Sequence, residues 1–436
     1  MIDRNTPPPL KPLENVDIPE LNRLTLPGGL RLNYLDTGCR DLIRVDMMCR
    51  SGALFQPRPL VAMLTNLLLK EGCRGMNSAE IAEKFDSYGA FLYYSYGMEY
   101  TYINLCTPKK FYAPTLSLLR DIWQYPTFPA HDLKVVLEQR YQQMKVDREK
   151  VKVMSSLKMN ELLFGASHPY GRMLQESDFD NFDRQLLADY HARYYRPERT
   201  QLVLTGDVDQ EVIDVTSRVF GNEIVDMARA PQTQDGPLDD YPQAQPSPQR
   251  RCFLPKEQSL QAAVRLSLPT VGQDHPDFMG LKVLNAILGG YFGSRLMTTV
   301  REEKGYTYGI FSTHTVYRNQ SYIDIETQTA IEYVKPLIEA VFQEMEKLKQ
   351  EPAGAEEMQL LRNYLSGEYA RMMDGPFALA DLYIAAESVG MDMASYRQQL
   401  EVMNRISGEE LQALAQKYFH EEDFYLVCAG GTQSPF

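Results

Sequence analysis

The spacing of apolar residues along the chain alternates between the pattern of a strand and that of a helix. The same order of predicted strands and helices occurs twice. The first part has a strand-like run, a helix-like run and an aromatic strand pair, at residues 44–49, 60–70 and 90–106. The second part has a strand, a helix and two strands in the same order, at residues 262–268, 278–288, 307–313 and 322–329. The chain is therefore predicted to contain two copies of one structural plan.

Each copy continues with a helix whose apolar residues recur every three or four positions. In the first copy the helix contains Leu116 and Leu119, and in the second it contains Leu337 and Val341. Both helices have a proline near their start, at positions 114 and 336, where a missing N–H is tolerated. Both copies then close with a helix that ends in two aromatic residues, followed by a strand and a glycine, within residues 186–206 and 411–430.

The 436 residues suit two domains of similar size. Residues 226–250 are rich in proline, glutamine and aspartate and lack apolar periodicity, which predicts an extended linker that joins the halves without fixing them. The expected domains are residues 1–225 and 251–436, with the linker between them. Strand runs followed by paired helices predict an α+β fold, a mostly antiparallel sheet with helices on one face in each half.

Charge and cysteine content restrict the classes of partner. The formal charge of −13 makes nucleic acid or an anionic membrane an unfavourable partner. No apolar stretch approaches a membrane-spanning length, and the first residues do not resemble a signal peptide. The six cysteines have no paired spacing, which is typical of buried thiols in a reduced protein. We expect a cytoplasmic protein.

Several motifs give the chain a resemblance to a known family. The run 168–171 reads His-Pro-Tyr-Gly, the run 293–296 reads Gly-Ser-Arg-Leu, and the run 301–305 reads Arg-Glu-Glu-Lys-Gly. With the helix at 60–70, they resemble the insulinase, pitrilysin and mitochondrial processing peptidase family from about Arg23 onward. The resemblance implies that the two halves form one lobe of a clamshell that encloses peptides.

The family's zinc motif is absent at the place where the resemblance puts it. Its first histidine falls on Ala62, its catalytic glutamate on Thr65 and its second histidine on Asn66. A catalytic zinc needs three nitrogen or oxygen ligands and a base beside the bound water, and these side chains cannot supply them. The family's third ligand should lie in residues 138–143, which are mostly neutral amides, and the six histidines have no helical ligand spacing. We expect no zinc in this chain and no peptidase activity by the chain alone.

Arg301 and Tyr308 match a second feature of the family. In the family an arginine and a tyrosine seven residues later reach the zinc site and hold the developing oxyanion. A guanidinium and a phenol O–H suit that role because both donate hydrogen bonds to negative oxygen. The alternative is that Arg301 is a solvated charge at a helix end and Tyr308 an ordinary strand aromatic. The resemblance also puts the aromatic strand at residues 93–102 near the bound peptide.

Two functions fit these observations. The first is the subunit of a heterodimeric peptidase that binds no zinc and supplies Arg301 and Tyr308 to the zinc site of a homologous partner. The second is a catalytically silent structural or peptide-binding homologue. Retention of the arginine and tyrosine favours the first, because a scaffold has no chemical need for an oxyanion donor pair.

Overall fold

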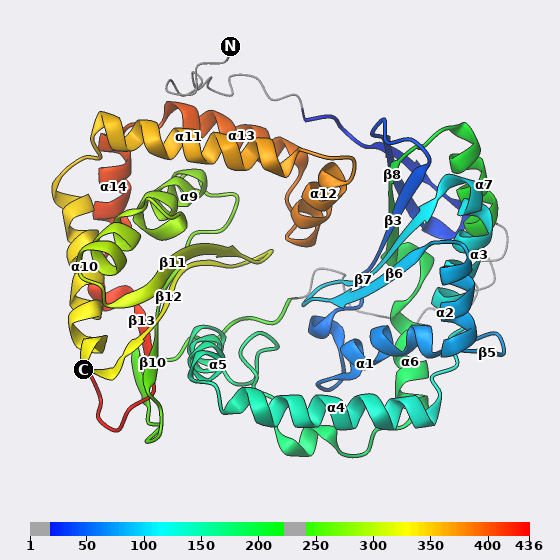
Figure 1. Ribbon diagram of the computed structural model, residues 1–436, viewed down its shortest axis with the longest axis horizontal. Coiled ribbons are helices and arrows are strands. Elements are labelled where there is room, and N and C mark those ends of the chain that lie inside the picture. The colour runs from blue at the N-terminus through cyan, green and yellow to red at the C-terminus, as the bar shows by residue number, and fades with distance from the viewer. Residues whose placement is uncertain (1–17, 222–240) are drawn as a thin grey trace, which may run out of the picture.

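The computed structural model describes residues 18–221 and 241–436. It contains two large sheets that face each other across the molecule, one built by each half of the chain (Figure 1). This arrangement confirms the predicted α+β fold with a duplicated sheet.

The first sheet has six strands. In spatial order they are β1 (Asn22–Thr25), β2 (Arg31–Asp36), β8 (Thr200–Gly206), β3 (Leu42–Cys49), β7 (Thr101–Pro108) and β6 (Phe91–Tyr96). β2 and β8 are parallel and every other neighbouring pair is antiparallel. Two short strands, β4 (Gly72–Cys73) and β5 (Met76–Asn77), form a separate hairpin.

The second sheet has five strands. In spatial order they are β11 (Thr307–Val316), β12 (Ser321–Ala330), β10 (Gln261–Thr270), β13 (Tyr425–Ala429) and β9 (Arg251–Leu254). β13 and β9 are parallel and the others are antiparallel.

The two sheets share one topology. In each, the last strand lies between a parallel strand, β2 or β9, and an antiparallel strand, β3 or β10, and an antiparallel hairpin completes the other edge. Both of these last strands end at a glycine with positive φ, Gly206 at 113° and Gly430 at 120°. A Cβ would lie 2.2 Å from the carbonyl oxygen of Leu42 in the first case and 2.7 Å from that of Gln261 in the second. In both halves a side chain at this position would collide with a backbone carbonyl, so the position requires glycine.

Helices from the same half cover one face of each sheet. On the first sheet the main ones are α1 (Val61–Leu68), α2 (Ser78–Ser87), α3 (Tyr112–Gln124), α6 (Arg184–Tyr194) and α7 (Gln210–Gly221). On the second they are α9 (Phe278–Asn285), α10 (Val334–Gln350), α11 (Ala355–Met372), α13 (Met393–Arg405) and α14 (Gly408–Tyr418). The long helix α4 (Ala130–Arg148) runs beneath α1 and leads toward the second half (Figure 1).

The other face of each sheet is covered by a helix from the opposite half. Helix α5 (Val151–Phe164) belongs to the first half and packs Leu162 and Phe164 against Tyr425 and Val427 of β13. Helix α12 (Ala378–Ser388) belongs to the second half and packs against the opposite face of β3 and β8. Sequence analysis predicts helices on one face only, because an apolar helical stripe does not show which sheet it meets. The exchange joins the halves through shared apolar cores.

The predicted linker lies partly outside the described residues. Its described part, residues 241–250, forms no helix or strand but is held firmly at Tyr241. The Tyr241 hydroxyl donates to Glu99 Oε2 at 2.6 Å and accepts from Arg50 Nη2 at 2.8 Å. Arg318 Nε donates to the same carboxylate at 3.0 Å. Glu99 is only 5% exposed, and a buried carboxylate needs such donors. The described part of the linker is therefore attached to both halves at Tyr241, whereas the sequence predicts a linker that does not fix them.

Candidate functional site

The positions of the lost zinc motif lie inside the protein core. Ala62, Thr65 and Asn66 on α1 are all 0% exposed. Ala62 belongs to the main apolar cluster of the first half. The Thr65 hydroxyl has no hydrogen-bond partner among the described residues. These two positions therefore present neither a ligand nor a base to solvent.

Asn66 has a structural role in the fold. Its Nδ2 donates to the backbone carbonyl of Ser95 on β6 at 2.8 Å, and its Oδ1 accepts from the Tyr195 hydroxyl at 3.4 Å. The amide thus ties α1 to the edge strand of the sheet. Because both ends of the side chain are used, Asn66 is not available as a metal ligand.

Neither the stretch expected to supply the third ligand nor the buried His191 provides a free ligand. Glu138 is exposed on α4, where its carboxylate accepts from Gln142 Nε2 at 2.7 Å. His191 is buried and its Nε2 lies 2.7 Å from the carbonyl oxygen of Trp123, and burial lowers the pKa of its ring to about 4. In the part of the chain that the structure describes, no group of three His, Cys, Asp or Glu side chains could hold a metal ion. The residues present do not fit a zinc site.

Arg301 and Tyr308 are brought together. Arg301 lies near the end of a π-helical segment, Met297–Glu303, and Tyr308 lies at the start of β11. The Nε of Arg301 donates to the backbone carbonyl of Tyr308 at 2.9 Å, and the guanidinium carbon lies 5.8 Å from the centre of the Tyr308 ring. Tyr308 is 94% exposed, the highest value among the large apolar and aromatic side chains described. The phenol is presented to solvent.

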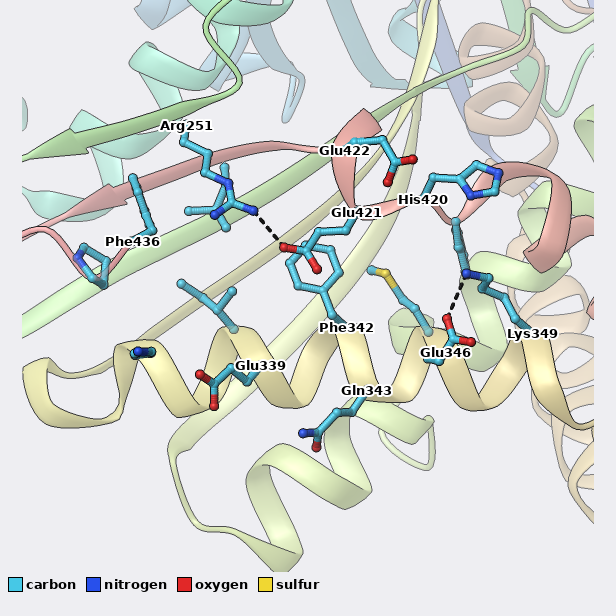
Figure 2. Close-up of a pocket in the computed structure, with 16 residues that line it drawn as sticks. Arg251, Glu339, Phe342, Gln343, Glu346, Lys349, His420, Glu421, Glu422 and Phe436 are labelled. Carbon is cyan, nitrogen blue, oxygen red and sulfur yellow. Dashed lines mark hydrogen bonds and ion pairs between the residues drawn. The ribbon is translucent and has the colours of Figure 1, made fainter.

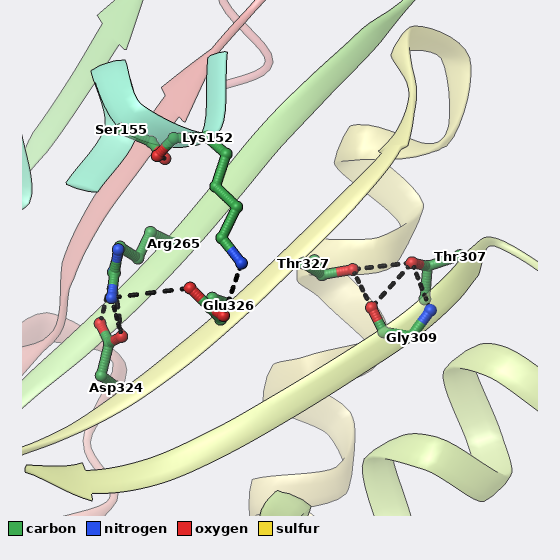
Figure 3. Close-up of polar contacts among 8 residues, drawn as sticks. All are labelled: Lys152, Ser155, Arg265, Thr307, Gly309, Asp324, Glu326 and Thr327. Carbon is green, nitrogen blue, oxygen red and sulfur yellow. Dashed lines mark hydrogen bonds and ion pairs between the residues drawn. The ribbon is translucent and has the colours of Figure 1, made fainter. Parts of the chain in front are cut away.

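A β-bulge explains the exposure of Tyr308. The β11–β12 ladder shifts register between Thr307 and Ile310, so that two residues of β11 face one residue of β12. Two threonines hold the bulge (Figure 3). The Thr307 hydroxyl lies 2.9 Å from the carbonyl oxygen of Gly309 and accepts from Gly309 N at 3.1 Å, and Thr327 Oγ1 lies 2.8 Å from the same carbonyl oxygen. The tyrosine therefore projects from an ordered backbone.

A cavity of about 350 Å³ opens directly beside Tyr308. Its rim includes Phe311, and an ion pair between the halves, Lys152 Nζ to Glu326 Oε1 at 3.0 Å, lies on its other side (Figure 3). Arg265 in turn forms a bidentate ion pair with Asp324. The two charged residues that line the cavity, Lys152 and Glu326, are thus paired with each other.

The aromatic strand of the first sheet divides into exposed and packed residues. Phe91, Tyr93 and Tyr96 on β6 are 72%, 68% and 45% exposed, and β6 is the edge strand of its sheet. Tyr94 is packed, and burial raises the pKa of its phenol. A groove of about 660 Å³ runs between β6 and α2. An edge strand with unpaired backbone groups can receive an extended peptide.

A larger cavity, of about 750 Å³, lies between α10 and the segment around Glu421 (Figure 2), and Arg301 and Tyr308 are not among its lining residues. Its apolar floor includes Phe342. Around it, Arg251 pairs with Glu421 at 2.7 Å and Lys349 with Glu346 at 2.8 Å. These charges are satisfied by one another, and the cavity gathers no nucleophile with a base.

The structure adds several residues that sequence reasoning missed around the Arg301–Tyr308 pair. They are Phe292, Thr307, Thr327, Lys152 and Glu326. A single strand-like run such as 307–313 carries no signal for a bulge, and Lys152 comes from the opposite half of the chain.

The comparisons with known proteins agree with one another. The family profile described as peptidase M16 inactive domain matches residues 181–365. An uncharacterized zinc protease of Bacillus subtilis, YmxG, is 22% identical over 357 residues, which covers 81% of this chain and 84% of that protein. An uncharacterized zinc protease of Mycobacterium tuberculosis is 29% identical over 168 residues, 37% of this chain and 36% of that protein.

Solved structures share the fold. A peptidase M16 inactive domain from Pseudomonas fluorescens superposes with a TM-score of 0.83 at 21% identity, covering 95% of this chain and 99% of that one. A protease from Helicobacter pylori gives 0.80 at 16% identity, covering 95% and 100%. Within the described ranges, no helix is long and apolar enough to cross a membrane. Together with the motifs and the altered α1 positions, these matches support an insulinase-family peptidase-like protein that lacks that family's zinc motif, with the inactive-domain profile matching less than half of the chain.

Proposed function

We propose that this chain is the subunit of a heterodimeric peptidase that binds no zinc, and that Arg301 and Tyr308 complete the zinc site of a homologous partner. The observation that carries the proposal is an ordered, solvent-exposed donor pair in a chain whose own zinc positions are buried and unsuitable. A donor pair of this kind needs a reacting carbonyl, and here the partner would bring both the zinc and the base.

The geometry suits stabilisation of an oxyanion. The phenol O–H of Tyr308 and the terminal nitrogens of Arg301 are hydrogen-bond donors for negative charge that develops on oxygen as the tetrahedral intermediate forms. The Arg301 Nε is already used by the Tyr308 carbonyl, so the Nη groups are the ones left to meet substrate. Glu302 Oε1 lies 3.8 Å from Nη1, too far for a hydrogen bond.

The substrate class proposed is an unfolded or short peptide in extended form, enclosed between this lobe and its partner. The free edge of β6, with exposed Phe91 and Tyr93, supports strand addition, in which backbone hydrogen bonds bind and pockets select side chains. The division into domains 1–225 and 251–436 is proposed with it, since each contains one complete sheet. A cytoplasmic location is also proposed and is supported by six free cysteines.

The second candidate is a catalytically silent structural or peptide-binding homologue. The core positions of Ala62, Thr65 and Asn66 fit it equally well. A silent homologue has no need for a tyrosine that is 94% exposed on an ordered β-bulge.

The proposal is tested by mixing this chain with a zinc-bearing M16 homologue from the same genome and following hydrolysis of quenched fluorescent peptides. We expect the pair to cleave peptides while neither chain does so alone. A mixture no more active than the zinc-bearing chain by itself would leave the silent homologue as the function.

A further inference from the structure

Phe292 is a large aromatic side chain that is 59% exposed on a glycine-rich loop. The Arg301 guanidinium carbon lies 4.6 Å from the centre of its ring, closer than to the ring of Tyr308 at 5.8 Å. An arginine over an aromatic face within about 6 Å is attracted by the ring quadrupole. The guanidinium therefore contacts the rings of Phe292 and Tyr308 and the backbone carbonyl of Tyr308.

The loop that carries Phe292 is anchored on both sides. Tyr291 stacks on Tyr364 of α11 with ring centres 4.7 Å apart, and Arg295 forms a bidentate ion pair with Glu357 at 2.8 Å. On the inner side, a Cβ on Gly289 would lie 2.7 Å from the Cβ of Ser312 on β11. The position of Phe292 is thus set by contacts with α11 and β11.

We propose that Phe292 is a positioning residue for Arg301, a role that rests on the proposed function and deepens it. An arginine side chain has several rotatable bonds and loses much conformational entropy when it is fixed. The carbonyl of Tyr308 fixes Nε, and the Phe292 ring covers a face of the planar guanidinium. The edge that carries the two Nη groups makes only the long, 3.8 Å ion pair from Nη1 to Glu302 among the contacts described, so a peptide carbonyl can reach it.

The first test uses the chain alone and does not depend on peptidase activity. In a sample labelled with ¹⁵N at arginine Nε, the Arg301 Nε–H signal is assigned by its loss in Arg301→Lys. We expect a ring-current shift of this signal that disappears in Phe292→Leu and persists in Phe292→Tyr. Phe182→Leu is the matched control, because Phe182 lies 4.5 Å from Arg58 in a similar contact elsewhere. An Arg301 signal unchanged by Phe292→Leu would overturn the proposal.

The second test uses the reconstituted pair. Phe292→Leu should lower kcat/KM by about 2- to 5-fold, the range expected for loss of one exposed cation–π contact. Phe292→Tyr should restore turnover, and Phe182→Leu should leave it unchanged. Wild-type turnover in Phe292→Leu, with Arg301→Ala inactive, would overturn the role of Phe292 while the proposed function stands. Wild-type turnover in Arg301→Ala would instead overturn the proposed function itself.

Discussion

Asn66 and Asn285 make the same contact in the two halves of the protein. Each lies on the helix that follows the first long strand of the repeat, and each donates its side-chain amide to a serine carbonyl on the edge strand of its sheet. The distances are 2.8 Å from Asn66 to Ser95 and 3.1 Å from Asn285 to Ser312. The position onto which the family's second zinc histidine falls in the first half, Asn66, therefore makes the same contact as Asn285 in the second half.

This relationship predicts that Asn66 supports stability. Asn66→Ala should lower the free energy of unfolding by about 1–3 kcal/mol, because it leaves the part-buried carbonyl of Ser95 without this donor and removes the acceptor of one Tyr195 hydrogen bond. Gln142→Ala, at an exposed site on α4, should change it by less than about 0.5 kcal/mol. Urea denaturation followed by circular dichroism measures both, and equal stability of the two variants would contradict the role.

The altered motif also predicts the metal content. The purified chain should contain no stoichiometric zinc after exposure to the metal, since Ala62 and Asn66 offer no ligand and Glu138 is directed elsewhere. Mass spectrometry of the native protein measures this. One tightly bound zinc per chain, removed by chelator together with peptidase activity, would show that the chain assembles a site from other residues.

The repeat could be predicted from sequence because each half keeps the same order of long, periodic elements. The short strands β1, β2 and β9 were missed. β9, at Arg251–Leu254, has only four residues and pairs only with β13, so it carries little periodic signal. The exchange of α5 and α12 could not be predicted, since an apolar face on a helix does not identify the sheet that it covers.

The candidate site was predicted in part. The resemblance to the family indicated Arg301 and Tyr308 as a pair, and the structure joins them through a hydrogen bond. The bulge that exposes Tyr308 depends on hydroxyls of Thr307 and Thr327, which lie on different strands. The contact of Phe292 with Arg301 depends on the path of a loop. Both are tertiary features without a local sequence signature.

Burial of His191 predicts a loss of stability in mild acid. The pKa of its ring is lowered from 6.5 to about 4 by desolvation, so between these values the unfolded chain binds a proton that the folded chain does not. This part of the stability is present above pH 6.5 and decreases as the pH falls toward 4. From pH 7 to pH 5 the loss due to His191 is about 2 kcal/mol.

The comparison that isolates this effect is His191→Phe, which keeps an aromatic ring between Phe128 and Tyr195 but cannot be protonated. Its free energy of unfolding should fall less between pH 7 and pH 5 than that of the wild type. His131→Gln, on the exposed side of α4, should retain the wild-type dependence. If His191→Phe shows the full wild-type slope, other groups cause the acid sensitivity.

The proposed shared site predicts different kinetic effects for its two donors. Tyr308→Phe removes the phenol O–H and keeps the ring, so in the reconstituted pair it should lower kcat by about 10²- to 10³-fold with little change in KM or in affinity for the partner. Arg301→Ala removes a charged donor that also meets the substrate before reaction, and it should lower kcat and raise KM.

Both variants should fold normally, because Tyr308 is 94% exposed and the side chain of Arg301 is partly exposed at the surface. Tyr125→Phe is a suitable control, since it removes the phenol O–H of an exposed tyrosine that lies over Arg74 in the first half. Steady-state hydrolysis by the mixed subunits, with assembly followed by analytical ultracentrifugation, separates loss of catalysis from loss of the complex. Wild-type kcat in both variants would show that the exposed pair takes no part in catalysis, and the silent homologue would then be the better account of this chain.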